Sequence, residues 1–269
     1  MAKLIHNSAF EEHDQENWYW TDGTNIFYRH YQIKGADIAT FEHFYGIWAK
    51  DRKNCYSGSH RLNNSDPATF VALNLTYAKD KDNAWVLAGR IVGADAATFE
   101  ACDDGKHSLG KIIKSIGSQK ISCEMFVPYG FAKDKNNVYY YDFAGKPKVV
   151  RKADPKMFKS LNDGHFAFDD QYVFCGSCTL PKANPKTWQK LKESYYYSLD
   201  RKNIFYFNRP IKDADTNTFE IVEIPGTSGN PTQLAKDKNT AYWTDRSITF
   251  EELKEETERQ IEFYNKIKI

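Results

Sequence analysis

Length, composition and charge limit the class of protein. The chain has 269 residues, enough for one large domain or two ordinary ones with a sizeable core. Hydrophobic residues make up 41% and charged residues 27%, which excludes a chain that is disordered by composition. With 37 basic and 36 acidic side chains, bulk charge gives no support for a nucleic-acid or membrane partner. The aromatic content of 15% needs its own explanation.

The cysteines and the hydropathy indicate a cytoplasmic protein. Residues 1–7 lack the apolar run of a signal peptide, and no window approaches the about 18 consecutive apolar residues of a membrane span. An odd number of cysteines at irregular spacing is typical of free thiols in a reducing compartment. The five are Cys55, Cys102, Cys123, Cys175 and Cys178.

A motif of the form Asp-x-x-Asn-x-aromatic recurs seven times along the chain. Its aspartates, here called the anchor aspartates, are Asp22, Asp51, Asp80, Asp134, Asp169, Asp200 and Asp237. The fifth and seventh copies lack the Asn, but all seven keep the aromatic residue five positions after the anchor. Successive anchors are 29, 29, 54, 35, 31 and 37 residues apart. Self-similarity at this period predicts a repeat protein.

Each anchor predicts a β-hairpin. The residue at position −3 from the anchor is large and apolar in every copy, and the residue at −2 is small in six of seven. Asp and Asn side chains bond the backbone of their own turn, so the pattern favours strand, polar turn and strand. With the turn centred between Asp and Asn, the residue at −2 lies opposite the aromatic at +5. A small residue facing a large one lets neighbouring hairpins pack closely.

A second element, Ala-Asp-x-x-Thr-Phe in its clearest copies, follows most anchors by fifteen residues. Its first polar residues, here called the cap residues, are Asp37, Asp66, Asp95, Asp154, Asn184 and Asp215. Three are followed by proline, and a polar cap followed by proline is a helix start. Each repeat is therefore predicted to hold a hairpin, a further short strand and a helix of about two turns. Its Phe or Trp should point inward, and Phe250 is counted as the seventh of these aromatics.

The fold class that follows is mainly β with short helices. We predict an array of antiparallel β-hairpin and short-helix repeats in a single repeat domain over residues 1–269, with about seven units between residues 19 and 250. Each unit would bury its aromatic face against its neighbours. The spacing leaves open whether the array is an open stack or a closed propeller.

The C-terminus predicts an amphipathic helix over residues 250–268. Thr249 and Glu252 have the spacing of a capping box. Leu253, Thr257, Ile261 and Tyr264 fall on one helix face. We interpret the helix as a cap on the end of the array, with a partner-binding helix as the alternative.

The gap of 54 residues between the third and fourth anchors is too long for one unit. It predicts an insertion or a degenerate eighth unit at residues 102–129. Residues 103–110 are polar and rich in turn formers, and residues 111–116 predict a short strand or a helical turn. Loops on a rigid scaffold often carry function. We therefore predict partner-binding residues there: Asp103, Asp104, Lys106 and His107.

No motif predicts a catalytic residue, a metal or a cofactor. Nucleotide-binding loops, zinc-protease helices and nucleophile elbows are absent from the sequence. Cys175-Gly176-Ser177-Cys178 suits a tight turn between two reduced cysteines. A structural zinc would need two further ligands, with Cys102 and Cys123 the remaining thiols near the insertion, and a redox role would favour a helix N-terminus. The Asp-Lys-Asn turns lack the ligand pattern of a calcium loop.

The segments 77–81, 131–140 and 235–239 resemble the bacterial DKNYY repeat family. The resemblance extends over about residues 19–250, because the Asp-Lys-Asn turn and the downstream Ala-Asp-x-x-Thr-Phe recur at a fixed offset. The function of that family is unassigned, so the resemblance implies neither a reaction nor catalytic residues. The chain departs from the pattern at the 54-residue gap, at the missing Asn of the fifth copy and in its shortened last unit.

These observations predict a non-catalytic cytoplasmic repeat protein that binds another protein, with no nucleic-acid or membrane partner. Its most concrete form is an immunity protein that binds and neutralises a bacterial toxin. One alternative is a glycan or cell-envelope ligand-binding module that uses exposed aromatic side chains. The other is an enzyme whose site is assembled from residues distant in sequence.

Overall fold

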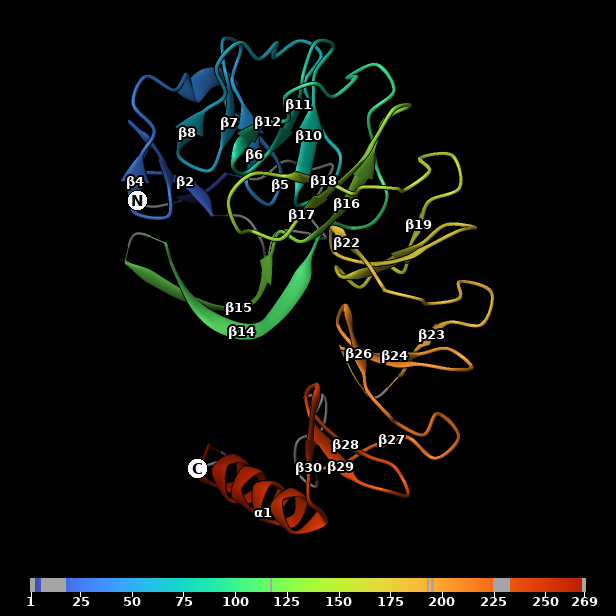
Figure 1. Ribbon diagram of the computed structural model, residues 1–269. Helices are drawn as coiled ribbons and strands as arrows, with labels where there is room; N and C mark the ends of the chain where they lie inside the picture. Colours follow the sequence, from blue (N-terminus) through green and yellow to red (C-terminus); the bar gives the residue numbers. More distant parts are fainter. Residues whose placement is uncertain are drawn as a thin grey trace. The chain divides into compact units, whose positions relative to one another are not determined.

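The computed structural model describes residues 3–5, 18–116, 118–192, 194, 196–224 and 233–267. The chain divides into two compact units, Met1–Ala167 and Phe168–Ile269, and both are built from small antiparallel sheets (Figure 1). The predicted mainly β repeat fold is confirmed. The predicted single repeat domain over residues 1–269 stays a prediction.

The first unit contains four four-stranded sheets, each a meander of short strands. Their strands are β1 (Lys3–Leu4), β2 (Tyr19–Thr21), β3 (Ile26–Tyr28) and β4 (Tyr31–Gln32); β5 (Glu42–Tyr45), β6 (Trp48–Lys50), β7 (Cys55–Ser57) and β8 (His60–Arg61); β9 (Val71–Ala72), β10 (Tyr77–Lys79), β11 (Ala84–Val86) and β12 (Gly89–Arg90); and β13 (Glu100–Ala101), β16 (Gly130–Lys133), β17 (Val138–Tyr141) and β18 (Lys148–Val149). Between β13 and β16 lies a separate two-stranded sheet, β14 (His107–Ile116) and β15 (Gln119–Val127).

Three further sheets and one helix complete the described chain. The boundary between the compact units falls in β20, a strand of the fifth sheet. The strands are β19 (Lys159–Ser160), β20 (Phe166–Phe168), β21 (Val173–Cys175) and β22 (Cys178–Thr179); β23 (Gln189–Lys190), β24 (Tyr197–Leu199), β25 (Ile204–Tyr206) and β26 (Arg209–Ile211); and β27 (Glu220–Ile221), β28 (Leu234–Lys236), β29 (Ala241–Trp243) and β30 (Arg246–Ile248). Helix α1 (Phe250–Ile267) follows the last sheet.

The hairpin register confirms the predicted opposition of small and aromatic residues. Ala78 pairs with Trp85 in β10–β11, and Ala132 pairs with Tyr139 in β16–β17. The same offsets pair Ala49 with Tyr56, Ser198 with Phe205 and Ala235 with Tyr242. The side chains at −3 are fully buried in all seven copies: Tyr19, Trp48, Tyr77, Phe131, Phe166, Tyr197 and Leu234. Most of the aromatic excess is therefore core.

The second half of each repeat is shorter than predicted. A 3-10 turn forms at Ile38–Thr40, with the Asp37 side chain accepting the Ala39 N–H as an N-cap, but the other copies are single hydrogen-bonded turns such as Asp66 to Thr69. The chain has no room for two helical turns, because a strand resumes directly after the aromatic residue. The sequence did not predict that strand. It forms the outer strand of the next sheet, as β9 does beside β10.

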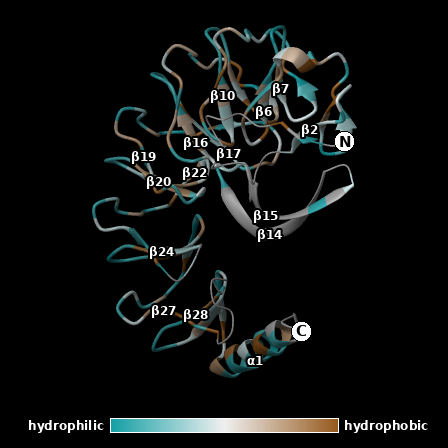
Figure 2. Cartoon of the chain, turned by 180° about the vertical axis from the view of Figure 1, so that it is seen from behind, coloured by the Kyte–Doolittle hydropathy of each residue, from teal (hydrophilic) through white to brown (hydrophobic). Residues whose placement is uncertain are grey.

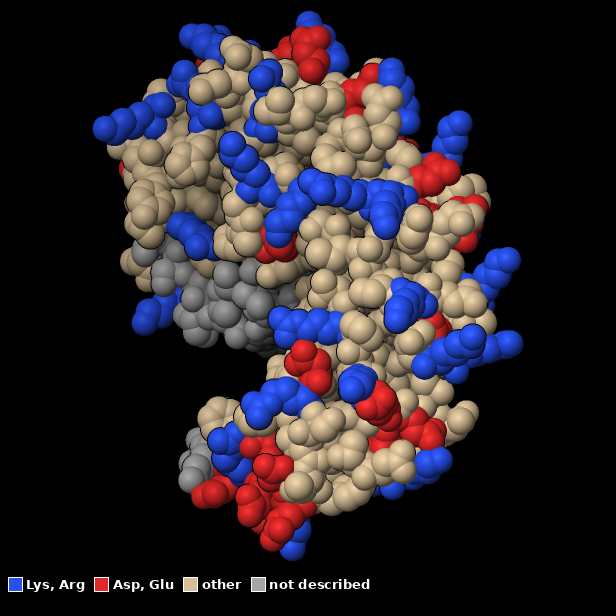
Figure 3. All heavy atoms as spheres, in the orientation of Figure 1, with Lys and Arg blue, Asp and Glu red and all other residues tan. Residues whose placement is uncertain are grey.

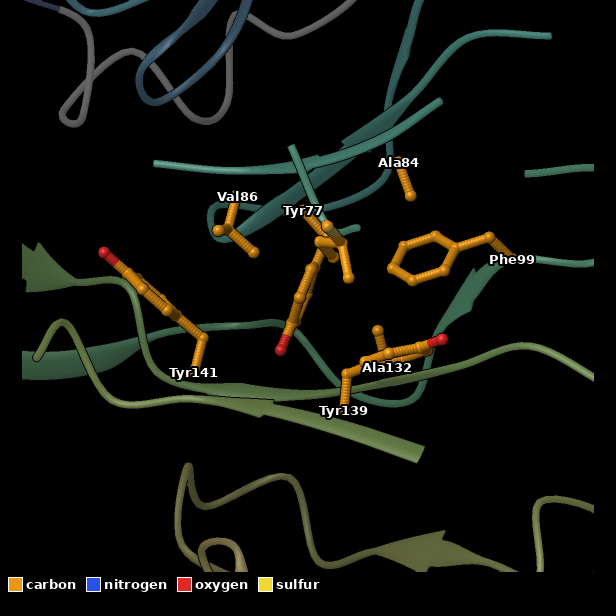
Figure 4. Packing of buried hydrophobic residues seen from close by; sticks show 8 residues of the cluster. Tyr77, Ala84, Val86, Phe99, Ala132, Tyr139 and Tyr141 are labelled. Atoms are coloured by element: carbon orange, nitrogen blue, oxygen red, sulfur yellow. The ribbon is translucent and has the colours of Figure 1, made fainter. Parts of the chain in front are cut away.

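Hydrophobic clusters lie between consecutive sheets. One contains Tyr77 and Phe99 on one side and Tyr139 and Tyr141 on the other, with Ala132 leaving room for the rings (Figure 4). The ring centroids of Phe99 lie 5.9 Å from those of both Tyr77 and Tyr139, a separation at which tilted aromatic rings attract. In these clusters, within each compact unit, a repeat completes its core with residues of the next repeat.

Helix α1 caps the last sheet. Thr249 and Glu252 exchange side-chain-to-backbone hydrogen bonds of 2.7 and 3.1 Å, which confirms the capping box. Buried Leu253 packs with Ile224 and Leu234, so the helix covers the end of this sheet. The prediction for Phe250 was wrong: at the first helical position its side chain is 49% exposed.

The hydropathy of the described residues follows this architecture. The connecting turns are largely hydrophilic, and α1 carries both polar and apolar residues (Figure 2). None of the helices in the described ranges combines the length and the hydrophobicity needed to cross a bilayer.

Candidate functional site

The anchor aspartates close their own hairpin turns. In all seven repeats Oδ1 accepts the backbone N–H groups of the residues two and three positions later. In Asp134 these bonds come from Asn136 and Asn137, at 2.7 and 2.8 Å. The chain can therefore reverse within four residues without leaving turn donors unsatisfied.

The second carboxylate oxygen joins one repeat to the preceding one. Oδ2 of Asp134 accepts the backbone N–H of Asp95 at 2.8 Å and the hydroxyl of Tyr139 at 2.9 Å. The backbone bond recurs in five pairs of repeats, from the cap residue to the next anchor: Asp37 to Asp51, Asp66 to Asp80, Asp95 to Asp134, Asn184 to Asp200 and Asp215 to Asp237.

Two exposed contacts accompany this bond. Thr98 Oγ1 accepts the N–H of Lys135 at 3.1 Å, and the Lys135 ammonium lies 2.7 Å from the Asp95 carboxylate. The ion pair recurs between Arg52 and Asp37, Lys81 and Asp66, and Lys238 and Asp215. The basic residue of the turn motif is thus an inter-repeat contact. The joint between two repeats consists of the anchor, the cap residue, the threonine and this basic residue.

Charge and hydrogen bonding set the acidity of the joints. Burial alone would raise the pKa of Asp134, but its hydrogen bonds from two turn N–H groups, Asp95 and Tyr139 outweigh burial and lower the pKa. The pKa of Asp51 and of Asp237 is lowered for the same reasons. The Lys135 ammonium, together with Thr98, lowers the pKa of Asp95 to about 2. These carboxylates are ionised at neutral pH and are held by the fold.

Tyrosine hydroxyls connect the buried part of the joints. The Tyr77 hydroxyl donates to the Gly130 carbonyl at 2.9 Å, in the next repeat. Tyr197 donates to the Gln233 and Thr244 carbonyls, each at 2.8 Å. These carbonyls lie beside the next hairpin, so a buried ring fills the core while its hydroxyl satisfies a neighbouring repeat. The sequence showed the apolar character of position −3 but not this polar role.

The predicted site residue Asp103 lies at the base of the inserted β14–β15 hairpin. Its Oδ1 accepts the N–H of Gly105, and its Oδ2 accepts the N–H of Phe131 and the hydroxyl of Ser160, all at 2.9 Å. The Phe131 ring is a position −3 side chain. Asp103 therefore performs the turn role that Asn74 performs in the preceding repeat, where Oδ1 accepts the N–H groups of Thr76 and Tyr77.

The insertion thus occupies one defined point in the repeat. Residues 74–76 connect β9 to the position −3 aromatic of the third repeat. Residues 103–130 make the same connection from β13 to the position −3 aromatic of the fourth repeat. Asp163 and Ser194 close the corresponding turns of later repeats with their side-chain oxygens. The variation in repeat length is concentrated at this connection. The two-stranded β14–β15 sheet lies within the segment 103–130.

Close packing holds the hairpin base. A Cβ at Gly130 would meet Asp103 Oδ1 at 2.3 Å, and one at Gly105 would meet the Asn74 side chain at 2.6 Å. Both glycines have positive φ, 149° and 62°. Burial raises the pKa of Asp103 to about 6, against the opposing effect of its three hydrogen bonds. Asp103 is thus a half-buried structural carboxylate.

The other predicted site residues are placed differently. Asp104 is exposed, but its N–H and its carboxylate bond the amide of Asn162 at 2.8 and 3.0 Å. Lys106 is half-buried, and His107 begins β14 with its side chain outside the described residues. The structure brings Asp103 and Asp104 together with Ser160 and Asn162. Partner binding by the four predicted residues stays a prediction.

The cysteines and charges define no cluster with metal-binding chemistry. Across the described part of the chain, no three His, Cys, Asp or Glu side chains lie close enough to share a metal ion. Cys175 and Cys178 lie on either side of the β21–β22 turn and are not joined by a disulfide, as predicted. Figure 3 shows basic and acidic side chains interspersed over the repeats on one face, with acidic residues gathered over α1.

Comparison with known proteins agrees with the repeat geometry. Neither the curated proteins nor the solved structures contain a match to the chain. A family model described as the DKNYY family matches residues 48–209 and 197–268. These ranges include six of the seven anchors and the joints that follow them. The chain therefore belongs to the DKNYY family.

Proposed function

We propose that the protein is a non-catalytic, cytoplasmic protein-binding repeat protein, and specifically an immunity protein that binds and neutralises a bacterial toxin. The observation that carries this proposal is the β14–β15 hairpin, a long element inserted at a single turn of an otherwise regular scaffold. The repeated polar residues support the proposal indirectly. They are used in turns and joints that hold the fold, which leaves the hairpin as the element added to the repeat.

The hairpin backbone suits recognition of an extended chain. Its strands are ten and nine residues long, whereas the other strands have two to four residues. Among the described strands, β14 and β15 pair only with each other, so each has a second edge. Free strand edges offer N–H and C=O groups to a partner strand, the mode known as β-augmentation.

The charge of the hairpin favours one occupant. The segment 106–127 contains Lys106, Lys111, Lys114 and Lys120 but only one acidic residue, Glu124. Two copies of this segment would bring like charges together, and lysine on edge strands discourages self-pairing. The proposed partner segment is therefore an extended, acidic stretch of another protein.

Affinity purification tests the proposal. The tagged chain is produced in its native cell, and proteins that co-purify at fixed stoichiometry are identified. We expect one partner that is toxic when produced alone and tolerated when produced with this chain. Recovery of the chain alone, or of a partner that is harmless on its own, would contradict the immunity function.

Two variants test the role of the hairpin. Replacing residues 103–130 with Asn-Leu-Thr, the sequence of residues 74–76, removes the hairpin while preserving the connection. Circular dichroism first verifies folding. The triple variant K111E/K114E/K120E keeps the hairpin length, and K146E/K182E/K186E makes the same charge change at three exposed scaffold lysines. We expect the first two variants to lose the partner and the third to retain it.

The other two functions remain predictions with distinct signatures. If the chain co-purifies without a protein, a glycan array tests the ligand-binding alternative. Exposed aromatic side chains that such a ligand could contact include Tyr31, Tyr172 and Trp243.

A further inference from the structure

We propose that Cys175 and Cys178 are a redox-responsive pair that forms a reversible disulfide across the β21–β22 turn. The two residues are direct register partners in this antiparallel pair. Directly opposed residues in such a ladder have Cα atoms about 4.5 to 5.5 Å apart. Disulfides need a Cα separation of about 4.4 to 6.8 Å. The register therefore places the two Cα atoms at a separation that a disulfide can span.

The repeat itself enforces this register. The positions six and nine residues after the anchor are opposed in five other repeats as well: Tyr28 and Tyr31, Ser57 and His60, Val86 and Gly89, Tyr206 and Arg209, and Trp243 and Arg246. None of those pairs contains cysteine. The turn therefore forms without thiols, and the two cysteines are not required by its geometry.

Cys175 is buried against its neighbours, whereas Cys178 is exposed. Val173 and Phe174 are fully buried and fix β21, and Cys175 is 9% exposed. Cys178 is exposed on β22. Between them, Gly176 has a φ of 56°, which glycine adopts without steric cost. A small oxidant can thus reach Cys178 first, with Cys175 opposite to complete the reaction.

The chemistry is thiol–disulfide exchange with a low-molecular-weight disulfide such as oxidised glutathione. The Cys178 thiolate attacks one sulfur of that disulfide, forms a mixed disulfide and releases one thiolate. The Cys175 thiolate then attacks Cys178 Sγ and releases the second. Each released thiolate takes up the proton lost by one cysteine, so one disulfide and two thiols yield one disulfide and two thiols.

Two other cysteines provide an internal contrast. Cys55 lies opposite Lys50 in the β6–β7 pair, and burial raises the pKa of the Cys55 and Cys102 thiols to about 12. The thiolate is the reactive form. These residues are therefore expected to stay reduced under conditions that oxidise the turn pair.

The test is oxidation of the purified full chain with oxidised glutathione, followed by mass spectrometry of peptides. We expect an intramolecular Cys175–Cys178 link that reduced glutathione reverses, with Cys55 and Cys102 unmodified. C175S should stop at the glutathione mixed disulfide on Cys178, and C178S should show no modification of Cys175. A wild-type product that retains glutathione on Cys178, links two chains or shows no oxidation would overturn the proposal.

A matched variant separates geometry from position. In a C175S/C178S background, S57C/H60C places thiols at the same register positions in the second repeat, with one side chain buried and one exposed and with the same Gly-Ser turn. We expect it to form the corresponding disulfide. Failure of this variant while the wild type reacts would show that the register is insufficient, and would overturn the geometric basis of the proposal.

Discussion

A single anchor carboxylate satisfies donors from two repeats. Asp134 receives two N–H groups of its own turn, the N–H of Asp95 and the hydroxyl of Tyr139, and is 3% exposed. Removing such an acceptor leaves buried donors without partners, and the cost is the desolvation of those groups rather than the loss of one bond. The repeats therefore depend on this residue for both hairpin and joint.

Replacement of the anchor should be strongly destabilising. Asp134→Ala removes all four acceptor contacts, and we expect a loss of about 3 kcal/mol or more in the free energy of unfolding. Asp134→Asn keeps one oxygen for the turn and should cost less. Urea denaturation measures both. Asp170→Ala, at an exposed neighbouring aspartate of the next repeat, serves as control and should change stability by about 0.5 kcal/mol or less. Equal losses at the two positions would contradict the role of the anchor.

The half-buried Asp103 should make the protein less stable as the pH rises, the opposite of the effect of anchors such as Asp134, whose pKa is lowered. Its pKa is raised to about 6 in the folded state, above about 3.9 in the unfolded chain. Between these values the unfolded state releases its proton first, so rising pH favours unfolding. Relative to Asp103→Asn, the wild type should lose about 2 kcal/mol of stability from pH 4 to pH 7. Denaturation of both proteins across this range measures it, and Asp104→Asn should retain the decline.

At the scale of the elements, one hairpin is inserted between two strands of a sheet, and tyrosine hydroxyls bond one sheet to the next. Asp103 closes the base of the hairpin because it accepts the N–H of Gly105 with one oxygen and the N–H of Phe131 with the other. The joints on either side keep their contacts. Elements between joints can therefore vary while the sheets stay in register.

The tyrosine link between consecutive sheets should contribute measurably. Tyr77→Phe preserves the buried ring but leaves the Gly130 carbonyl without its hydroxyl donor. We expect a loss of about 1 to 2 kcal/mol in the free energy of unfolding. Tyr31→Phe, on an edge strand where the ring is 56% exposed, is the control and should be nearly neutral. A neutral Tyr77→Phe would show that the hydroxyl adds nothing to ring packing.

Local patterns predicted the hairpins because their causes are local. The anchor, the small residue at −2 and the aromatic at +5 lie within eight residues, and the observed pairing of Ala78 with Trp85 follows from turn length alone. The bond from Asp95 to Asp134 was not predictable, because it joins residues 39 positions apart across a variable loop. The β14–β15 hairpin was predicted only as a short strand or helical turn, although Gly-Ser between two runs of lysine and isoleucine is a sequence signal for a hairpin.

At the scale of the whole molecule, stability is distributed over nearest-neighbour interfaces. Each hydrophobic cluster within a compact unit belongs to two consecutive sheets, or to the last sheet and α1. In such a chain the terminal element protects only what it touches. Local unfolding should therefore begin where a cap is weakened.

Weakening the C-terminal cap should open one sheet selectively. Leu253→Asp places a carboxylate among Ile224, Leu234 and Ala241, a cost of several kcal/mol that helix burial cannot offset. We expect faster amide hydrogen exchange in β27–β30 and α1, with protection of β9–β12 unchanged. Lys254→Asp, at the next and exposed position, is the control. Uniformly faster exchange in every sheet would indicate global rather than local coupling.

The bond from Asp95 to Asp134 also gives the array a direction. In the five joints with this bond, the cap residue of one repeat donates and the anchor of the following repeat accepts. A segment copied from anchor to anchor carries one donor and one acceptor, so tandem duplication inside the gene lengthens the protein without orphaning either. After the last anchor, Arg246 to Thr249 lead into helix α1 in place of a cap residue. Growth of this lineage is therefore expected by internal copying, with the C-terminal helix inherited as a fixed end.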